Sequence, residues 1–421
     1  MKPPFLAALL LTRLPFYYGW VVLGCVCLAG FARQGPAVAV LSIFVVPMTA
    51  EFGWSRLEIA GAVSLGGLMA AVVSPLLGPL LDRRGARLVL CLALLGTGFA
   101  CMALSLVASL LGFYLLFCFA RMIFAGPFDL GLYGALNNWF VARRARANSI
   151  AKLAQLSGLV ALPVIAQFAM NDGGADPGGN WRAGWIAVGA TVLIVGLPPC
   201  WLLLVRRPED AGLAADPRPP GKDGTPPAAE LQFSRAEAMR TRAFWLLALF
   251  TVLVYPVQAG VSLHQAAHLI ERGLPALAAA TAIGVFSASS AVASFAVGFL
   301  PHHWGPRGPM MAGALLMALG SAALIGVASA EAAYLAAAVF GLGLGAAITP
   351  LPVAWADYFG RESYGAIRGV VLAMQVVAQA VGPVLSGLLR DVSGDYTLSL
   401  IVFAALAALG VAAAAMAQRP G

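Results

Sequence analysis

The sequence predicts an all-α integral membrane protein with twelve transmembrane helices arranged as two halves of six. Three observations support this. The 421 residues are 61% hydrophobic and only 10% charged, and the mean hydropathy is +0.87. A soluble domain is about 45–50% apolar and about 25% charged, so this chain cannot cover a water-facing surface of its size. The composition excludes a soluble enzyme, a DNA-binding protein and a secreted disulfide scaffold.

Apolar runs long enough to cross a bilayer, which takes about 20 residues, recur along the whole chain. The predicted spans of the first half are 17–46, 59–81, 88–108, 111–137, 149–170 and 183–205, and those of the second half are 243–266, 277–300, 309–329, 332–355, 365–389 and 398–416. They predict one six-helix bundle within residues 1–205 and a second within 243–421.

The segment 206–242 between the two sets is rich in proline and charge, which predicts a flexible linker. Within it, Phe233 to Arg242 is expected to form a short surface helix. The stretch from Met1 to Leu14 has a short apolar run but lacks a small-residue cleavage site, which predicts a cytoplasmic tail and not a signal peptide.

Lysine and arginine predict the orientation, since they accumulate in cytoplasmic loops. Of the 26 cations, we assign 20 to one set of loops, the termini and the linker, and Arg368 is among them. Four lie in the opposite set and two inside spans. Both termini and the linker are therefore expected to be cytoplasmic. The net charge of +8 reports topology, and we expect no nucleic-acid partner.

An internal repeat relates the two halves. The segment from Gly78 to Arg87 matches the segment from Gly298 to Arg307 at an offset of 220, with both glycines and the final arginine in common, and Trp139-Phe140 matches Tyr358-Phe359 at 219. Glycine and arginine could simply punctuate short turns, but two matches at nearly one offset favour a repeat. Parallel repeats of six helices are typical of transporters that rock about a midplane site.

The segment from Gly78 to Arg87 resembles the signature of the major facilitator superfamily between helices 2 and 3, and Arg121 to Gly126 resembles its helix-4 motif. More narrowly, the chain resembles the monocarboxylate porter branch and its bacterial oxalate–formate-antiporter-like members. The matching stretches are Tyr17–Trp20, Glu51–Arg56, Trp139-Phe140 with Arg143, Arg144 and Arg146, His264 and His268 with Glu271–Gly273, and Ala356–Gly360 with Tyr364-Gly365.

The resemblance implies a secondary transporter that works by alternating access in the bacterial inner membrane, surrounded by the lipid bilayer. Its partners would be a small-molecule solute and protons. No cofactor is implied, and the architecture can work as a monomer. The sequence has no phosphate-binding loop, which argues against an ATP-driven pump.

Charged side chains inside spans are costly and usually functional, and three are predicted: Arg33, Arg121 and Asp129. Arg33, next to Gln34, is our first candidate for the anion site, because a guanidinium holds a carboxylate bidentately. The alternative for Arg33 is a structural role, in which it bonds backbone carbonyls or extends toward the membrane surface.

Arg121 and Asp129 lie eight residues apart on one predicted helix, about 12 Å along its axis, which is too far for an ion pair. Each needs another partner, on helix 1 or in the second half. Asp129, the only carboxylate inside a predicted span, is either the proton carrier or a fixed counter-ion for Arg33 or Arg121. The resemblance favours a coupling or packing role for Arg121.

His264 and His268 lie one turn apart at the outer end of helix 7. No third ligand is evident, so we expect no metal there. Proton uptake or pH sensing is one hypothesis for them, and a structural role lining a gate is the other. Seven polar residues inside spans either contact solute or hold helices together. They are Tyr133, Asn137, Gln155, Tyr255, Gln258, Gln375 and Gln379.

A conformational latch is predicted in the signature segment. Asp82 is expected to cap or bond a neighbouring helix end on the cytoplasmic side and so hold one conformation. The other latch residues are Gly78, Arg83, Gly85 and Arg87. In the second half His302 replaces the aspartate, which predicts a weaker or pH-sensitive equivalent.

The chain departs from its branch in the second half. Animal monocarboxylate porters carry an Asp–Arg pair on helix 8, and oxalate–formate antiporters use an arginine there and a lysine on helix 11. Residues 283–297 here hold no charge, and neither does helix 11 beyond Arg368, which argues against oxalate. Either Arg33 has taken over anion binding, or the solute is not a simple carboxylate.

Our leading hypothesis is proton symport of a small organic anion, most simply a monocarboxylate. The main alternative is efflux of an amphipathic compound by proton antiport. A sensor that binds a solute without carrying it is a third hypothesis. An enzyme is disfavoured, because the chain lacks clustered histidines, cysteines or carboxylates near one membrane face.

Overall fold

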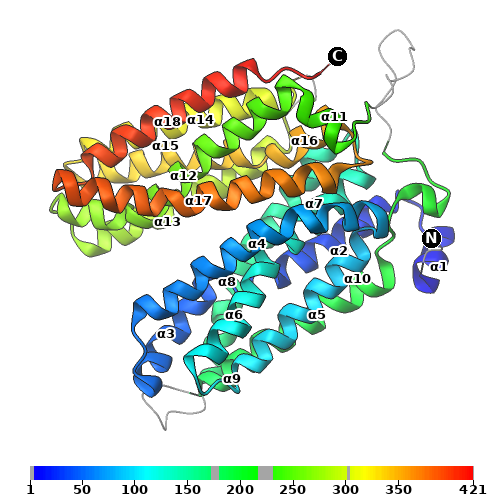
Figure 1. The fold of residues 1–421 in the computed structure, drawn as a ribbon, viewed down its shortest axis with the longest axis horizontal. Coiled ribbons are helices and arrows are strands. Elements are labelled where there is room, and N and C mark those ends of the chain that lie inside the picture. Colours follow the sequence, from blue (N-terminus) through cyan, green and yellow to red (C-terminus); the bar gives the residue numbers. More distant parts are fainter. Residues whose placement is uncertain (1–3, 172–179, 217–230, 301–303, 421) are drawn as a thin grey trace. The chain divides into compact units, whose positions relative to one another are not determined.

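The computed structural model describes residues 4–171, 180–216, 231–300 and 304–420, and within them the chain is helical apart from turns, loops and one isolated bridge (Figure 1). All twelve predicted spans are present. Eleven are helices or helix pairs of membrane-spanning length, and the first is formed by the shorter apolar helices α2 and α3.

The elements of the first half are α1 (Phe5–Arg13), α2 (Gly19–Ala32), α3 (Val38–Phe52), α4 (Arg56–Arg84), α5 (Ala86–Leu104), α6 (Leu110–Ala125), α7 (Pro127–Trp139), α8 (Arg144–Met170), α9 (Trp181–Thr191), η1 (Val192–Gly196) and α10 (Leu197–Leu203). The second half contains α12 (Arg242–Glu271), α13 (Ala276–Val297), α14 (Arg307–Ile325), α15 (Ala330–Ile348), α16 (Leu351–Phe359), α17 (Tyr364–Ser393) and α18 (Thr397–Met416).

Between the halves lie η2 (Pro208–Ala211) and α11 (Arg235–Arg240). The latter is the short helix predicted within 233–242, and its N-terminus has a capping box of Ser234 and Glu237. Residues 217–230 of the linker, with Arg218 and Lys222, lie outside the described residues, as do Lys2 and His302. The predicted division into 1–205, 206–242 and 243–421 stays a prediction.

The helices form two compact units that depart from this division at two helix ends. Unit 1 contains residues 1–143, 150–228 and 364–373, and unit 2 contains 144–149, 229–363 and 374–421. The first ten residues of α17 thus belong with the first unit, and the first six residues of α8 belong with the second.

The first and fourth spans are interrupted within unit 1, and the tenth is interrupted in unit 2 between α15 and α16. The first span breaks between Ala32 and Val38, because Pro36 has no N–H and disfavours helical backbone at the residue before it. The fourth breaks at Gly126, whose φ of −107° and ψ of −83° end α6, and Pro127 then starts α7. Each of the two breaks in the first half places a helix end inside unit 1. The charged side chains at these ends are Arg33, after α2, and Asp129, at the start of α7.

The structure strengthens the predicted repeat. Gly85 and Gly305, which match at the offset of 220, both adopt positive φ, of 84° and 58°. Gly53 and Gly273 also lie 220 apart and both have positive φ. The same offset relates Pro36 to Pro256 and Pro163 to Pro383, all at helix breaks or inside helices.

Unit 2 is held together by close helix contacts. Helices α12, α14, α15 and α18 lie side by side in Figure 1, and α14 packs on both α15 and α18. Along the contact of α14 with α15, a Cβ on Gly320 would lie 2.6 Å from the backbone nitrogen of Phe340, and one on Gly343 would lie 2.5 Å from that of Met317. Only glycine permits this approach.

This contact predicts a difference between two glycine-to-alanine substitutions. Gly320→Ala should lower the thermal midpoint, because α14 must move off α15 at a cost of about 1–3 kcal/mol. In Gly284→Ala the new Cβ meets nothing within 4 Å, so the helix propensity of alanine, about 1 kcal/mol better than glycine, should leave stability equal or higher. Thermal unfolding in detergent compares the two. A midpoint for Gly320→Ala at or above that of Gly284→Ala would contradict the packing.

Candidate functional site

A buried carboxylate lies between two arginines in unit 1. One Oδ of Asp129 accepts a hydrogen bond from Nη2 of Arg368 at 3.1 Å, and the other lies 3.8 Å from Nη1 of Arg33. The side chains of Arg33, Asp129 and Arg368 are 10%, 9% and 1% exposed. Desolvated charges at this depth need such pairing, since an isolated one would be strongly unfavourable.

Three helix ends position these groups. Arg33 directly follows α2 at the break, and Asp129 lies in the first turn of α7 after the break at Gly126. The positive end of the α7 dipole stabilises a carboxylate there. Arg368 lies in the second turn of α17, in the part of that helix that belongs to unit 1.

Arg33 makes further contacts around the carboxylate. Its Nε donates to the carbonyl of Phe124 at 3.0 Å, and Nη1 donates to Oε1 of Gln155 at 3.3 Å. Gln155 is 4% exposed, and its Nε2 is buried without a hydrogen-bond partner among the described residues. The Nε group of Arg33 therefore bonds a backbone carbonyl, as the structural alternative for Arg33 predicts. Beside it, Nε2 of Gln155 is a hydrogen-bond donor with no partner among the described residues.

Arg121 brings a third guanidinium close to this group. Its Cζ lies 4.3 Å from the centroid of the Phe124 ring, and that of Arg33 lies 4.6 Å from the same centroid. Its Nη1 reaches the Pro36 carbonyl at 3.5 Å, while its Nε is buried without a partner in the described part of the chain. Three guanidiniums and one carboxylate leave a formal charge of +2, which favours an anion.

The structure corrects three sequence predictions about these charges. Arg368 is not a loop cation: it is buried in α17 and pairs with Asp129. Arg121 and Asp129 do not share one continuous helix, because Gly126 separates α6 from α7. Asp129 is also not the only carboxylate within a span. Asp357 lies in the membrane-length segment Ala330–Phe359 and accepts a 2.7 Å hydrogen bond from Arg144, another buried arginine that we had placed in a loop.

The repeat shows that the fold does not require charge at these positions. At offsets of 219 and 220, the counterparts of Asp129 are Ile348 and Thr349, and those of Arg368 are Ser149 and Asn148. All four are uncharged, and unit 2 still folds as a compact unit. Unit 2 has a buried pair of its own, Arg144 with Asp357, at other positions of the repeat.

Asp82 forms hydrogen bonds to the start of α17. Its two carboxylate oxygens accept from the backbone N–H groups of Gly365 at 2.7 Å and Ala366 at 2.8 Å, two of the unpaired donors of that helix end. Gly78 makes this approach possible, because a Cβ there would clash with the Gly365 carbonyl. The structure thus provides the bond to a helix end that the sequence predicts, while the role as a latch stays a prediction.

The remaining latch residues surround the turn after α4. Gly85 has the positive φ, and the Arg206 side chain covers it. Arg206 donates to the carbonyl of Arg83 at 3.2 Å and pairs with Asp210, which raises the pKa of its guanidinium. The Cζ atom of Arg87 lies 5.1 Å from the centroid of the Trp201 ring. Arg83 thus contributes its backbone here and not its charge.

The other predicted polar residues are distributed over both units. In unit 1, Gln34 is buried at the break after α2, and Tyr133 is buried one turn after Asp129. In unit 2, Nε2 of Gln379 donates to Oε1 of Gln258 at 3.0 Å, which joins α17 to α12. Tyr255 and Gln375 are buried. The hydrogen bond between Gln258 and Gln379 agrees with the hypothesis that these polar residues hold helices together.

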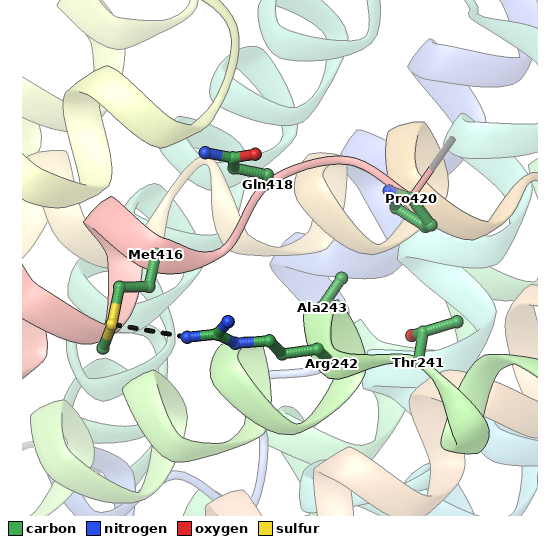
Figure 2. A pocket seen from close by; sticks show the side chains of 6 residues that line it. All are labelled: Thr241, Arg242, Ala243, Met416, Gln418 and Pro420. Carbon is green, nitrogen blue, oxygen red and sulfur yellow. Dashed lines mark hydrogen bonds between the residues drawn. The ribbon is translucent and has the colours of Figure 1, made fainter.

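His264 and His268 both contact backbone carbonyls in unit 2. Nε2 of His264 lies 3.2 Å from the Pro383 carbonyl, and Nε2 of His268 lies 2.8 Å from that of Leu324. No group of three metal-ligating side chains occurs among the described residues. A separate pocket of about 300 Å³ lies between the start of α12 and the end of α18, where Arg242 points toward the sulfur of Met416 (Figure 2). It contains none of the predicted site residues.

Two halves of six apolar spans, related by a repeat and carrying buried charges, are the architecture of a multi-pass membrane transporter. The chain belongs to the Major Facilitator Superfamily, whose family profile matches residues 22–383 and 271–420. Among its relatives are monocarboxylate transporter 11 of human, 29% identical over 92% of this chain and 80% of that protein, and monocarboxylate transporter 11 of mouse, 28% identical over 91% and 84%. The resemblance to the monocarboxylate branch is thereby confirmed.

Solved structures share the twelve-helix fold. The E. coli fucose:proton symporter covers 96% of this chain and 100% of its own, with a TM-score of 0.71 at 13% identity. The proton:xylose symporter XylE covers 94% of both chains, with a TM-score of 0.71 at 13% identity. The human organic anion transporter MFSD10 covers 94% and 98%, with a TM-score of 0.67 at 15% identity.

The pairing of Asp129 with Arg368 predicts strong energetic coupling between them. Arg368→Met alone should destabilise unit 1 by about 3–5 kcal/mol, because it removes one partner of a buried pair, and the double variant with Asp129→Asn should lose less than the sum of the two single variants. The free energy of unfolding in detergent measures this cycle.

The matched control for this cycle is Arg182 with Glu51, a bidentate pair that is 41% and 38% exposed. Its coupling should stay below about 1 kcal/mol. The buried ion pair would be contradicted if the effects of the two single substitutions on the free energy of unfolding simply added. It would also be contradicted if their coupling energy were no larger than that of the exposed pair.

Proposed function

We propose that the protein carries a small monocarboxylate together with a proton, with Arg33 and Arg368 as carboxylate ligands and Asp129 as the proton carrier. The observation that supports this most strongly is the arrangement of one buried carboxylate between two arginines. The only carboxylate of this cluster already occupies the position that a carboxylate solute would take. The monocarboxylate transporters among the relatives point to the same class of solute.

In this proposal the carboxylate of the solute replaces that of Asp129 as the counter-ion of the two arginines, and this replacement couples proton binding to solute binding. When Asp129 takes up a proton, Arg33 and Arg368 lose their counter-ion, and the uncompensated cluster attracts an anion. A bound carboxylate restores the balance, and deprotonation of Asp129 would expel it. Proton and anion then favour each other's binding, as linkage requires. Nε2 of Gln155 and Nε of Arg121 have no hydrogen-bond partner among the described residues, and they are the additional donors that a carboxylate would use.

The other predicted residues take secondary roles in this proposal. Gln34 and Tyr133 shape the cluster in unit 1, and Arg121 keeps the excess positive charge beside Phe124. Tyr255, Gln258, Gln375 and Gln379 are proposed as solute contacts of unit 2, and His264 and His268 as its proton-exchanging groups. Location in a bacterial inner membrane, with both termini cytoplasmic, is part of this proposal, and the lysine and arginine count supports the orientation.

Proton flux in liposomes tests the proposal. Internal pH is recorded at zero membrane potential while single carboxylates are added outside, with empty liposomes as the control for leakage of protonated acids. We expect protein-dependent acidification with one acid. Asp129→Asn should abolish it. Arg33→Lys and Arg368→Lys should slow it at least about tenfold, because a hydrogen bond to a charged group contributes about 1.5–3 kcal/mol.

The matched control is Arg182→Lys, an exposed arginine outside the cluster, which should leave the rate unchanged. Acidification that survives Asp129→Asn would overturn the role of Asp129. No response to any acid would overturn carboxylate symport, and the uncharged α13 would then favour efflux of an amphipathic compound by proton antiport. Binding of a solute without flux would indicate the sensor.

The latch is the second part of the proposal. Asp82 holds the start of α17, where Arg368 lies within two turns, so release of that helix end would free the arginine cluster to change shape. Asp82→Asn keeps the size of the side chain but weakens both bonds to N–H groups. We expect the transport rate to fall severalfold while solute binding persists. Asp391→Asn, 73% exposed, is the control. An unchanged rate in Asp82→Asn would contradict the latch.

A further inference from the structure

A small cavity lined by both apolar and polar residues lies in unit 2, whereas the arginine cluster belongs to unit 1. Its volume is about 10 Å³, close to what one water molecule needs. The polar side chains that line it come from α12, α17 and the start of α18. They are His264, Gln265, His268, Ser386, Tyr396 and Ser399.

Gln265 lines this cavity with an unsatisfied amide. The residue is 3% exposed, and both its Nε2 and its Oε1 are buried without a partner among the described residues. A buried amide with no hydrogen bond is strongly unfavourable, so native proteins pair such groups with protein or with ordered water. The neighbouring hydroxyls are already engaged in part, since Ser399 donates to Ser386 at 2.7 Å.

The histidines supply a further acceptor. A carbonyl oxygen only accepts hydrogen bonds, so Nε2 of His264 and of His268 each carries the hydrogen that it donates to Pro383 and Leu324. Nδ1 of His264 then accepts from the hydroxyl of Tyr396 at 3.2 Å. Nδ1 of His268 is left with its lone pair, on a residue that lines the cavity.

We propose that this cavity is a binding site for one water molecule, which bridges the amide of Gln265 and Nδ1 of His268. The water has the two or more polar partners that buried water requires. It satisfies an amide that no described side chain reaches, and it joins groups of α12, α17 and α18 into one hydrogen-bonded cluster.

The surrounding backbone gives this water a mechanical role. Helices α12 and α17 both contain a proline near the cavity, Pro256 and Pro383, and each proline removes one backbone hydrogen bond. The two helices are in contact there, since a Cβ on Gly382 would clash with the Pro256 carbonyl. A water can change partners as two such helices bend, which fixed side-chain bonds cannot do.

Hydroxyl-radical labelling by radiolysis in H₂¹⁸O tests for the water, because it marks side chains that lie next to bound water. Phe403 lines the cavity and is 1% exposed, while Phe250 is 0% exposed and does not line it. We expect severalfold faster labelling of Phe403 than of Phe250 in the unmodified protein. This comparison needs no variant. Equal rates would show a dry cavity and overturn the proposal.

Gln265→Met provides the second arm. If water satisfies the amide, the substitution should reduce labelling of Phe403 to the rate of Phe250 and leave the thermal midpoint equal or lower. If the cavity is dry, removal of two unpaired groups should raise the midpoint and leave labelling unchanged, which would overturn the proposal. Gln167→Met, at an exposed glutamine of α8, is the control. Neither readout depends on which solute is carried.

Discussion

The pairing of Asp129 with two arginines is the constraint on which unit 1 depends. Each of the three charges would be prohibitively costly alone at this depth, and together they are stable. The pairing also determines which backbone features the unit needs. A span must break after α2 to present Arg33, another must break at Gly126 to put Asp129 at a helix start, and α17 must begin next to α4 to bring in Arg368. The breaks in the helices are therefore needed to bring the charged side chains together.

Asp82 connects this cluster to the helix that supplies Arg368. The carboxylate holds the first N–H groups of α17, and glycine at positions 78 and 365 lets the two backbones meet. Gly369 lies one helical turn after Gly365, and a Cβ there would clash with the backbone of Ser74. Close backbone contacts of this kind resist small displacements, because packed interfaces deform in discrete steps and not continuously.

The sequence predicts most of the fold and about half of this cluster. Hydropathy and the 220-residue offset predict all twelve spans, because both depend on local composition. Arg33 and Asp129 can be identified as buried charges, because a charged residue inside a long apolar run is easy to recognise. From the sequence alone, Asp129 is also a candidate counter-ion of Arg33. Arg368 is missed for a physical reason: it lies near a helix start, where an arginine that enters the bundle and one that faces the cytoplasm look alike in sequence. Its partner is 239 residues away, so no local pattern connects the two.

The two repeats share their backbone geometry but place their buried ion pairs at different positions. Both units use the same proline and glycine positions, so backbone geometry is common to them. At the positions of Asp129 and Arg368, however, unit 2 has only neutral side chains. Unit 2 instead pairs Arg144, at the start of α8, with Asp357 of α16 at 2.7 Å, so the two repeats differ in the position of the buried pair and not in its presence. Replacing a buried ion pair by neutral groups is often neutral or stabilising, and buried charges in membrane proteins commonly serve ion recognition.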